Sequence, residues 1–177
     1  MLFTPNPKLR NPMNPSQFNS SEVIFSISVF VLPFLLGSLH AKFAGSTNMA
    51  STLLSYYVFI GVGLQGLITG IVQIAKPDWV VDYVHWPFSH FLTELGMANV
   101  SYGIIGILSL WMGIGWRNAV AVGYSIFLFA TFLRHIVDII QNGFYSGNSG
   151  AFLLTDLFIP FILLLLLGLQ NKPDNTI

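Results

Sequence analysis

The sequence has no cysteine and few charged residues, and both shortages narrow what the protein can be. Without cysteine the chain cannot form a disulfide, an iron–sulfur cluster or a thiolate zinc site. Seven basic and seven acidic residues among 177 give a formal net charge of zero. The basic residues form no cluster that would suit nucleic acid, so we expect no such partner. No nucleotide motif or haem-type histidine pair is present, so no cofactor and no catalytic class is indicated.

Long apolar runs are what the sequence has instead. Hydrophobic residues make up 54% of the chain, and the mean hydropathy is +0.70. A helix needs about 20 apolar residues to cross roughly 30 Å of hydrocarbon. The stretches that qualify are 21–41, 49–75, 88–112, 117–142 and 150–169. We therefore predict an all-α, polytopic transmembrane bundle of five spans. A four-span alternative, with the first segment at the membrane interface, stays open.

The expected domain organisation is one transmembrane domain, 21–170, between two tails. Residues 1–20 carry four prolines among Asn and Ser, which favours a disordered polar tail. Residues 171–177 form the second tail. The apolar run after the first tail is too long for a cleaved signal, so we interpret it as a retained span. The odd number of spans places the tails on opposite sides of the membrane.

The gap at 76–87 differs from the short turns elsewhere. Trp79, Tyr83 and Trp86 recur there at helical spacing, with Asp78 and Asp82 beside them. Because amphipathic aromatic side chains favour the headgroup region, we predict a short interfacial helix near 78–85. This helix is an anchor in one interpretation and a lid over a cavity in the other.

Ionisable residues inside the spans are the strongest functional signal. They are Glu94, Arg134, His135, Asp138 and Asp156. A charged residue costs ~2.5–3.5 kcal/mol at the centre of a span on insertion scales. Counted at 1.5 Å per residue, Glu94, His135 and Asp156 lie ~6–10 Å below the membrane face next to the N-terminus. We predict that these three share one polar cavity, with Arg134 and Asp138 paired at its edge.

Three further residues extend this candidate site. Pro160 follows Asp156 by four residues and deprives the Asp156 carbonyl of its helical partner, as in interrupted transporter helices. Gln65 and Asn99 add neutral polar groups deeper in the bilayer. The full candidate ligand or proton site is therefore Glu94, His135, Asp138, Asp156, Asn99 and Gln65.

The chemistry of this site has several interpretations. Carboxylates with an imidazole suit a proton relay or a transition-metal ion, for which Glu94, His135 and Asp156 are the candidate ligands. An intramembrane enzyme using Glu94 and His135 as an acid–base pair is less favoured. The same residues could instead be structural, with Arg134 neutralising Asp138 and the others fixing helix register.

Glycines form two stripes at helical spacing, Gly63, Gly66 and Gly70 on the second span and Gly96, Gly103 and Gly106 on the third. Small residues at this spacing let another helix backbone approach closely. We predict helix packing there, with a glycine-lined channel as the lesser interpretation. If the partner helices belong to another chain, the protein is an accessory or assembly subunit, or a homo-oligomer. The uniformly apolar run 161–167 is expected to face lipid.

A set of residues from the second span onward resembles an uncharacterised family of small bacterial multi-span membrane proteins. The residues that carry the resemblance, over roughly 60–165, are Gly63, Gln65, Gly66, Trp86, Pro87, Ser89, Glu94, Gly96, Ala98, Asn99, Gly103, Gly106, His135, Gly147, Asn148, Gly150, Asp156 and Pro160. A looser similarity to DoxX-like proteins lies in size and span count. The resemblance implies a multi-pass protein of the bacterial inner membrane and supplies no activity.

Overall fold

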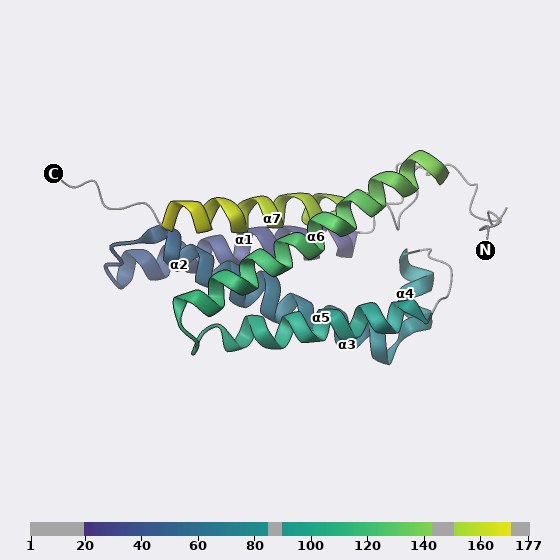
Figure 1. Ribbon diagram of the computed structural model, residues 1–177, viewed down its shortest axis with the longest axis horizontal. Helices are drawn as coiled ribbons and strands as arrows, with labels where there is room; N and C mark the ends of the chain where they lie inside the picture. Colours follow the sequence, from purple (N-terminus) through teal and green to yellow (C-terminus); the bar gives the residue numbers. More distant parts are fainter. Residues whose placement is uncertain (1–19, 85–89, 143–150, 171–177) are drawn as a thin grey trace.

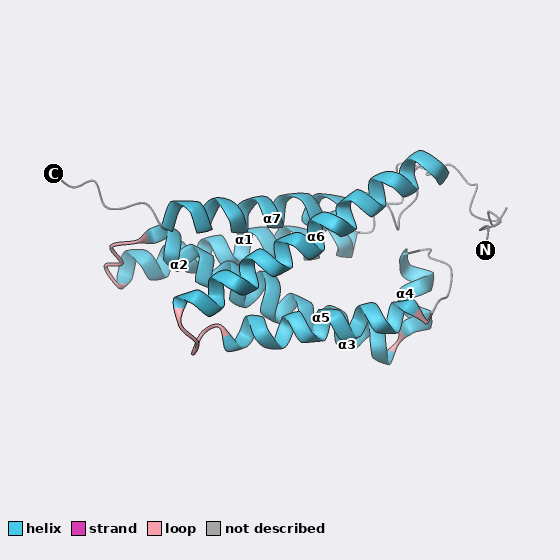
Figure 2. Cartoon of the chain, in the orientation of Figure 1, coloured by secondary structure: helices cyan, strands magenta, loops and turns pink. Residues whose placement is uncertain are grey.

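The computed structural model describes residues 20–84, 90–142 and 151–170, and every regular element in these ranges is a helix (Figures 1 and 2). Those long and apolar enough to cross a membrane are Ile24–Phe43, Met49–Ala75, Phe91–Leu108, Ile114–Gln141 and Leu153–Gln170. By helix length and composition, the prediction of an all-α bundle with five spans is confirmed. The two expected tails lie outside the described residues, as do Trp86 and the loop with Gly147 and Asn148.

The helices follow one another along the chain with short connections. In order they are α1 (Ser20–Phe43), α2 (Met49–Tyr56), the π-helix η3 (Tyr57–Leu64), α3 (Gln65–Ala75), α4 (Pro77–Val84), α5 (Phe91–Leu108), α6 (Ile114–Asn142) and α7 (Ala151–Gln170). The second span is therefore α2, η3 and α3 in succession. The long helices lie roughly side by side, and the start of α1 and the end of α7 are at opposite ends of the bundle (Figure 1).

The main core lies between α1, the first half of the second span, α6 and α7. Leu54, Val58, Ala121 and Leu163 are completely buried in it. In a bilayer the drive to bury apolar surface is weak, so close van der Waals packing has to hold such a core together. The apolar run 161–167 contributes to this core as well as to the surface. Phe161 is exposed but Leu163 is buried, so the expectation that the whole run faces lipid is wrong.

A second, backbone-to-backbone contact joins the second span to α5. A β-carbon added to Gly70 would lie 2.5 Å from the carbonyl oxygen of Gly96, and one added to Gly103 would lie 2.5 Å from the amide nitrogen of Leu67. Gly106 meets Gly63 in the same way one turn further along. No side chain fits at these distances. The two glycine stripes therefore face each other within the chain.

The π-helix η3 is an element that the sequence pattern does not predict. The amide of Gln65 reaches back to the carbonyl of Ile60, a five-residue step that widens the helix. Gly63 lies within this segment, and its missing side chain permits the close approach of the α5 backbone at Gly106 and Ile107. Short π segments often occur at functional sites.

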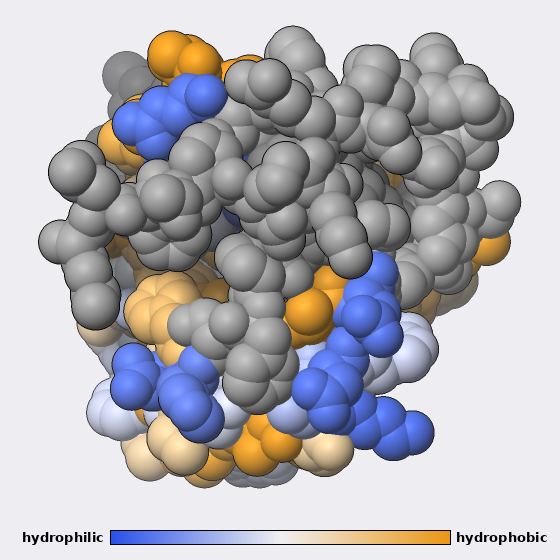
Figure 3. Space-filling model, turned by 90° about the vertical axis from the view of Figure 1, so that its right-hand side faces the viewer, coloured by the Kyte–Doolittle hydropathy of each residue, from blue (hydrophilic) through white to orange (hydrophobic). Residues whose placement is uncertain are grey.

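The short helix α4 matches the element expected near 78–85. Its Val80 is buried against Leu92 of α5, while the Trp79 side chain is 55% exposed. Figure 3 looks onto this end of the molecule and shows hydrophilic side chains along the edge formed by α3, α4 and the start of α5. Polar side chains at the end of apolar helices suit a position at a membrane face.

The turn between the third and fourth spans lies earlier in the chain than expected. The sequence suggests a turn at 113–116, but α5 ends at Leu108 and α6 begins at Ile114. The Ser109 hydroxyl donates to the Gly106 carbonyl at 2.6 Å and helps to end α5. The amide of Arg117 already bonds the Gly113 carbonyl at 3.3 Å. Arg117 therefore belongs to the first turn of a membrane-spanning helix.

Candidate functional site

Two of the predicted site residues meet between α6 and α7. Nε2 of His135 lies 3.5 Å from Oδ2 of Asp156. Both residues are only 8% exposed, and α6 packs closely along α7. The contact is long for a hydrogen bond but close enough for an ion pair. An imidazole and a carboxylate thus lie together inside the bundle, on two different spans.

Asp138 completes this end of α6. Its Oδ1 lies 3.9 Å from Nη1 of Arg134, one helical turn earlier. Asp138 is buried, but the Arg134 side chain is 67% exposed, so this pair contributes little to stability. Because His135 and Asp138 are three residues apart on one helix, both side chains belong to the same neighbourhood. The hydroxyl of Thr131 bonds its own helix at the Phe127 carbonyl and is not part of the ion pair.

Glu94 is not brought to this pair by the fold. It lies in the first turn of α5 and is exposed. The principal neighbours of α5 are α3 and η3, and Figure 1 shows α5 on the opposite side of the bundle from α7. A matched depth along the membrane normal does not decide which helices are neighbours. The expected cavity of Glu94, His135 and Asp156 is therefore reduced to the last two, with Asp138 beside them.

The neutral candidates lie on the other side of the bundle. Nδ2 of Asn99 donates to Oε1 of Gln73 at 2.8 Å, and both side chains are buried between α5 and α3. This bond reinforces the glycine contact between the two helices. Oε1 of Gln65 is buried and has no hydrogen-bond partner among the described residues. The structure thus assigns Asn99 to packing and does not join Gln65 to the His135–Asp156 pair.

The donor set for a metal ion is incomplete in the described ranges. Nowhere in 20–84, 90–142 or 151–170 do three His, Asp or Glu side chains gather closely enough to hold a metal. The proposed trio fails because Glu94 is on the far side. Protein metal sites commonly use three or four side-chain ligands, so His135 and Asp156 alone are a weak metal site.

A second polar cluster, which the sequence interpretation missed, surrounds Arg117 at the opposite end of the bundle. Nη1 of Arg117 donates to the carbonyl and Nη2 to the hydroxyl of Ser51, at 3.2 and 3.0 Å. Nη1 also donates to the Ser55 hydroxyl, and Nη2 donates to Oε1 of Gln170 at 2.7 Å. The Gln170 amide in turn donates to Asn118 at 2.8 Å. The cluster therefore ties α2, α6 and α7 together.

This buried guanidinium has only neutral partners. Arg117 is 8% exposed, and no carboxylate in the described ranges forms an ion pair with it. Its Nε is buried and has no hydrogen-bond partner in those ranges. A guanidinium stays charged at any physiological pH. The cluster consequently keeps an uncompensated positive charge inside a membrane span.

Both clusters lie within the part of the chain that matches the model of a known family. Residues 23–176 match the model of a family of unknown function (DUF6790). The chain belongs to this family. The membership confirms the resemblance to an uncharacterised family and extends it over nearly all of the chain. No curated protein and no solved structure matches the chain.

The family match includes Arg117 as well as His135, and a signal for the Arg117 cluster was present in the sequence. Ser51 and Ser55 are four residues apart at the start of the second span, Arg117 follows the third, and Gln170 ends the fifth. Alternation of the spans brings these positions to the same membrane face. The depth argument that selected His135 and Asp156 would have selected them too, had Arg117 not been assigned to a span boundary.

Proposed function

We propose that this membrane protein binds a proton, or a small cation in its place, at His135 and Asp156. The single observation that carries the proposal is the 3.5 Å approach of two ionisable side chains, both buried, from different spans. Buried ionisable residues within membrane spans are costly and commonly mark proton or ion paths.

The pair suits a proton because its ion-pair and neutral forms differ only in the position of one proton. The proton can reside on the imidazole, which makes an ion pair, or on the carboxyl, which makes a neutral pair. Uptake of a second proton leaves a net positive charge on the pair, next to the buried Asp138. Because a buried charge is costly, binding is coupled to the packing of these two helices. Pro160, one turn beyond Asp156, weakens the helix where such a rearrangement would take place.

A proton is a better fit than a transition metal. His135 and Asp156 offer two ligand atoms, and Glu94 is on the far side of the bundle. A proton or a weakly bound monovalent cation needs no full set of protein ligands, because hydroxyl and carbonyl oxygens or water complete its contacts. The family resemblance favours the inner membrane of a bacterium as the location, with lipid as the immediate partner.

An accessory subunit that binds partner helices through its glycine faces is the competing function. The geometry supports it less well, because the six glycines meet one another inside the chain. A partner, or a second copy of the chain, would have to use another surface.

An infrared pH titration of the purified protein tests the proposal. Between about pH 4 and pH 9, a carboxyl band should titrate in the unaltered protein and be absent from Asp156→Asn. His135→Gln should move the midpoint of that band, because it removes the facing imidazole. Glu94→Gln, which changes an exposed carboxylate on α5, is the matched control and should leave the midpoint in place. A band that is unchanged in both Asp156→Asn and His135→Gln would contradict the proposal.

A further inference from the structure

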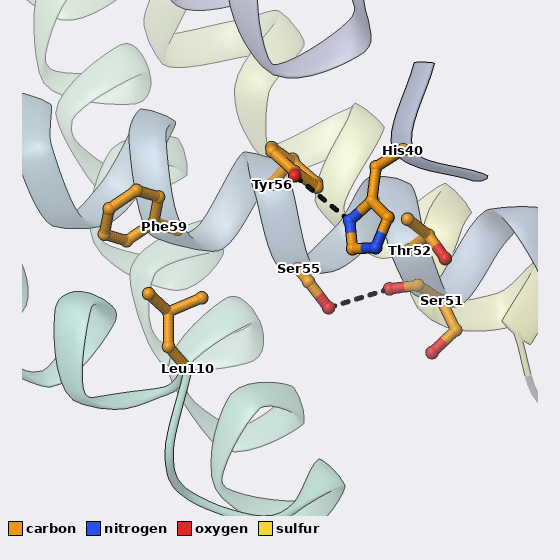
Figure 4. Close-up of a pocket in the computed structure, with 7 residues that line it drawn as sticks. All are labelled: His40, Ser51, Thr52, Ser55, Tyr56, Phe59 and Leu110. Carbon is orange, nitrogen blue, oxygen red and sulfur yellow. Dashed lines mark hydrogen bonds between the residues drawn. The ribbon is translucent and has the colours of Figure 1, made fainter. Parts of the chain in front are cut away.

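A second site lies beside the Arg117 cluster, at the end of the molecule opposite His135 and Asp156. An open cavity of about 400 Å³ is bordered there by α1, the second span and the turn after α5. Four hydroxyl side chains, one imidazole and two apolar side chains line it (Figure 4). The cavity is separate from the proposed proton site and shares no residue with it.

The polarity of the cavity changes along its length. Figure 4 shows His40, Ser51 and Thr52 toward one end, and Phe59 and Leu110 together at the other. Ser51 is in the first turn of the second span, close to a membrane face, and Phe59 is roughly 10 Å further along the helix. A ligand that fills this space has a polar head near the membrane surface and an apolar part that extends into the hydrocarbon.

At the polar end of the cavity, two hydrogen-bond donors have no acceptor among the described residues. The Ser51 hydroxyl accepts from Arg117, and its own hydrogen has no acceptor among the described residues. Nδ1 of His40 and the Tyr56 hydroxyl are 3.1 Å apart and share one hydrogen. A neutral imidazole and a phenol have two such hydrogens between them, so a second one remains for a ligand. Ser51 and the His40–Tyr56 pair thus supply two free donors.

The positive charge of Arg117, next to these donors, favours a negatively charged ligand. Arg117 bonds to both Ser51 and Ser55, which line the cavity, and it has no counter-ion in the part of the chain that the structure describes. A cation one hydroxyl away strengthens the Ser51 hydroxyl as a donor and creates a positive potential in a region of low dielectric constant. An anionic oxygen is the complement of this arrangement.

From these observations we propose that the cavity binds the phosphate headgroup of an anionic phospholipid. Different oxygens of the phosphate accept from Ser51 and from the His40–Tyr56 pair, and the first part of an acyl chain lies against Phe59 and Leu110. The membrane supplies this ligand at high local concentration, and the cavity is at headgroup depth.

Native mass spectrometry of the full chain in a neutral detergent tests the proposal. The probes are phosphatidylglycerol and phosphatidylcholine with identical acyl chains. We expect a preference for phosphatidylglycerol, because the choline of phosphatidylcholine adds a positive charge that Arg117 repels. Ser51→Ala should weaken the binding of phosphatidylglycerol by roughly 10- to 100-fold, the effect of one hydrogen bond to a charged group. Ser101→Ala is the matched control, because the Ser101 hydroxyl bonds its own helix on the exposed side of α5. Equal binding of both lipids, or no effect of Ser51→Ala, overturns the proposal.

Two further measurements separate the source of the anion and the role of the charge. If excess inorganic phosphate displaces phosphatidylglycerol, the site recognises a soluble phosphate as well; if it does not, the lipid is the ligand, and both results keep the anion site. The Arg117→Gln variant, purified as a single species by gel filtration, should no longer prefer phosphatidylglycerol over phosphatidylcholine. Its persistence overturns the proposal. Arg117→Lys should retain the preference, since it keeps the charge.

Discussion

At one end of the bundle Arg117 is surrounded by hydroxyl, carbonyl and amide oxygens, whereas at the other end His135 contacts Asp156 directly. Both clusters join α6 to α7, and both are buried. The two clusters differ in whether their charge depends on protonation. The charge of Arg117 is permanent, while the charge of the His135–Asp156 pair depends on where its protons are.

This difference separates a structural role from a responsive one. Arg117 makes hydrogen bonds to α2 and α7 from α6, so its removal breaks several contacts at once. The contact between His135 and Asp156 is long, at 3.5 Å, and both of its groups can exchange protons. We therefore expect stability to depend mainly on the Arg117 cluster, and proton or cation binding mainly on the His135–Asp156 pair.

The largest effect on stability should come from Arg117→Met. The change keeps most of the side-chain volume but leaves the acceptors of Ser51, Ser55 and Gln170 without their donor, which should cost about 3 kcal/mol of unfolding free energy. Unfolding in mixed micelles of a neutral detergent and dodecyl sulfate measures this loss. Arg134→Met, on the same helix but at an exposed arginine, is the matched control and should change stability by less than about 1 kcal/mol. Equal losses in the two variants would remove the distinction between the clusters.

Gln170→Ala should have an intermediate effect. It removes one acceptor from Arg117 and the donor to Asn118, yet the Ser51 and Ser55 bonds remain. We expect a loss of about 1–2 kcal/mol in the same unfolding measurement. Gln141→Ala, an exposed glutamine near the opposite end of α6, should be nearly neutral. A neutral result for Gln170→Ala would indicate that the serines alone satisfy Arg117.

Asp156→Asn should change stability by less than about 1 kcal/mol, because it keeps the shape of the side chain and His135 can release its proton, which leaves no unpaired charge buried. The same variant should lose the titrating carboxyl band, so that stability and protonation respond separately. The comparison of the clusters fails if Asp156→Asn destabilises as much as Arg117→Met, since both would then be structural.

The smallest net effect is expected for Pro160→Ala. It restores an amide to the Asp156 carbonyl, worth up to ~3 kcal/mol in an ordinary helix, but it also empties the space of a buried ring. These terms oppose each other, so we expect a net change within about 1 kcal/mol. A changed midpoint of the carboxyl titration would link Pro160 to the proton site. An unchanged midpoint with increased stability would show that the proline only weakens the helix.

The sequence by itself determined the all-helical class, the number of spans and the spacing of the glycine stripes. Each of these follows from local properties, because a run of about 20 apolar residues has to satisfy its backbone as a helix in lipid. The helical step alone places Gly96, Gly103 and Gly106 on one face. It also predicted that His135 and Asp156 lie at the same level of their helices, which agrees with the 3.5 Å between their side chains.

Only the tertiary structure decided which helices are neighbours. Glu94 has the expected depth but is on a helix packed against α3, so it does not reach Asp156. Asn99 bonds Gln73 rather than a ligand, and Leu163 faces the core although its run is uniformly apolar. Rotation about a helix axis and the order of helices around a bundle depend on contacts between distant segments. The Arg117 cluster is the clearest case, because alternation of the spans places its residues near one membrane face, but only the folded bundle brings its three helices together.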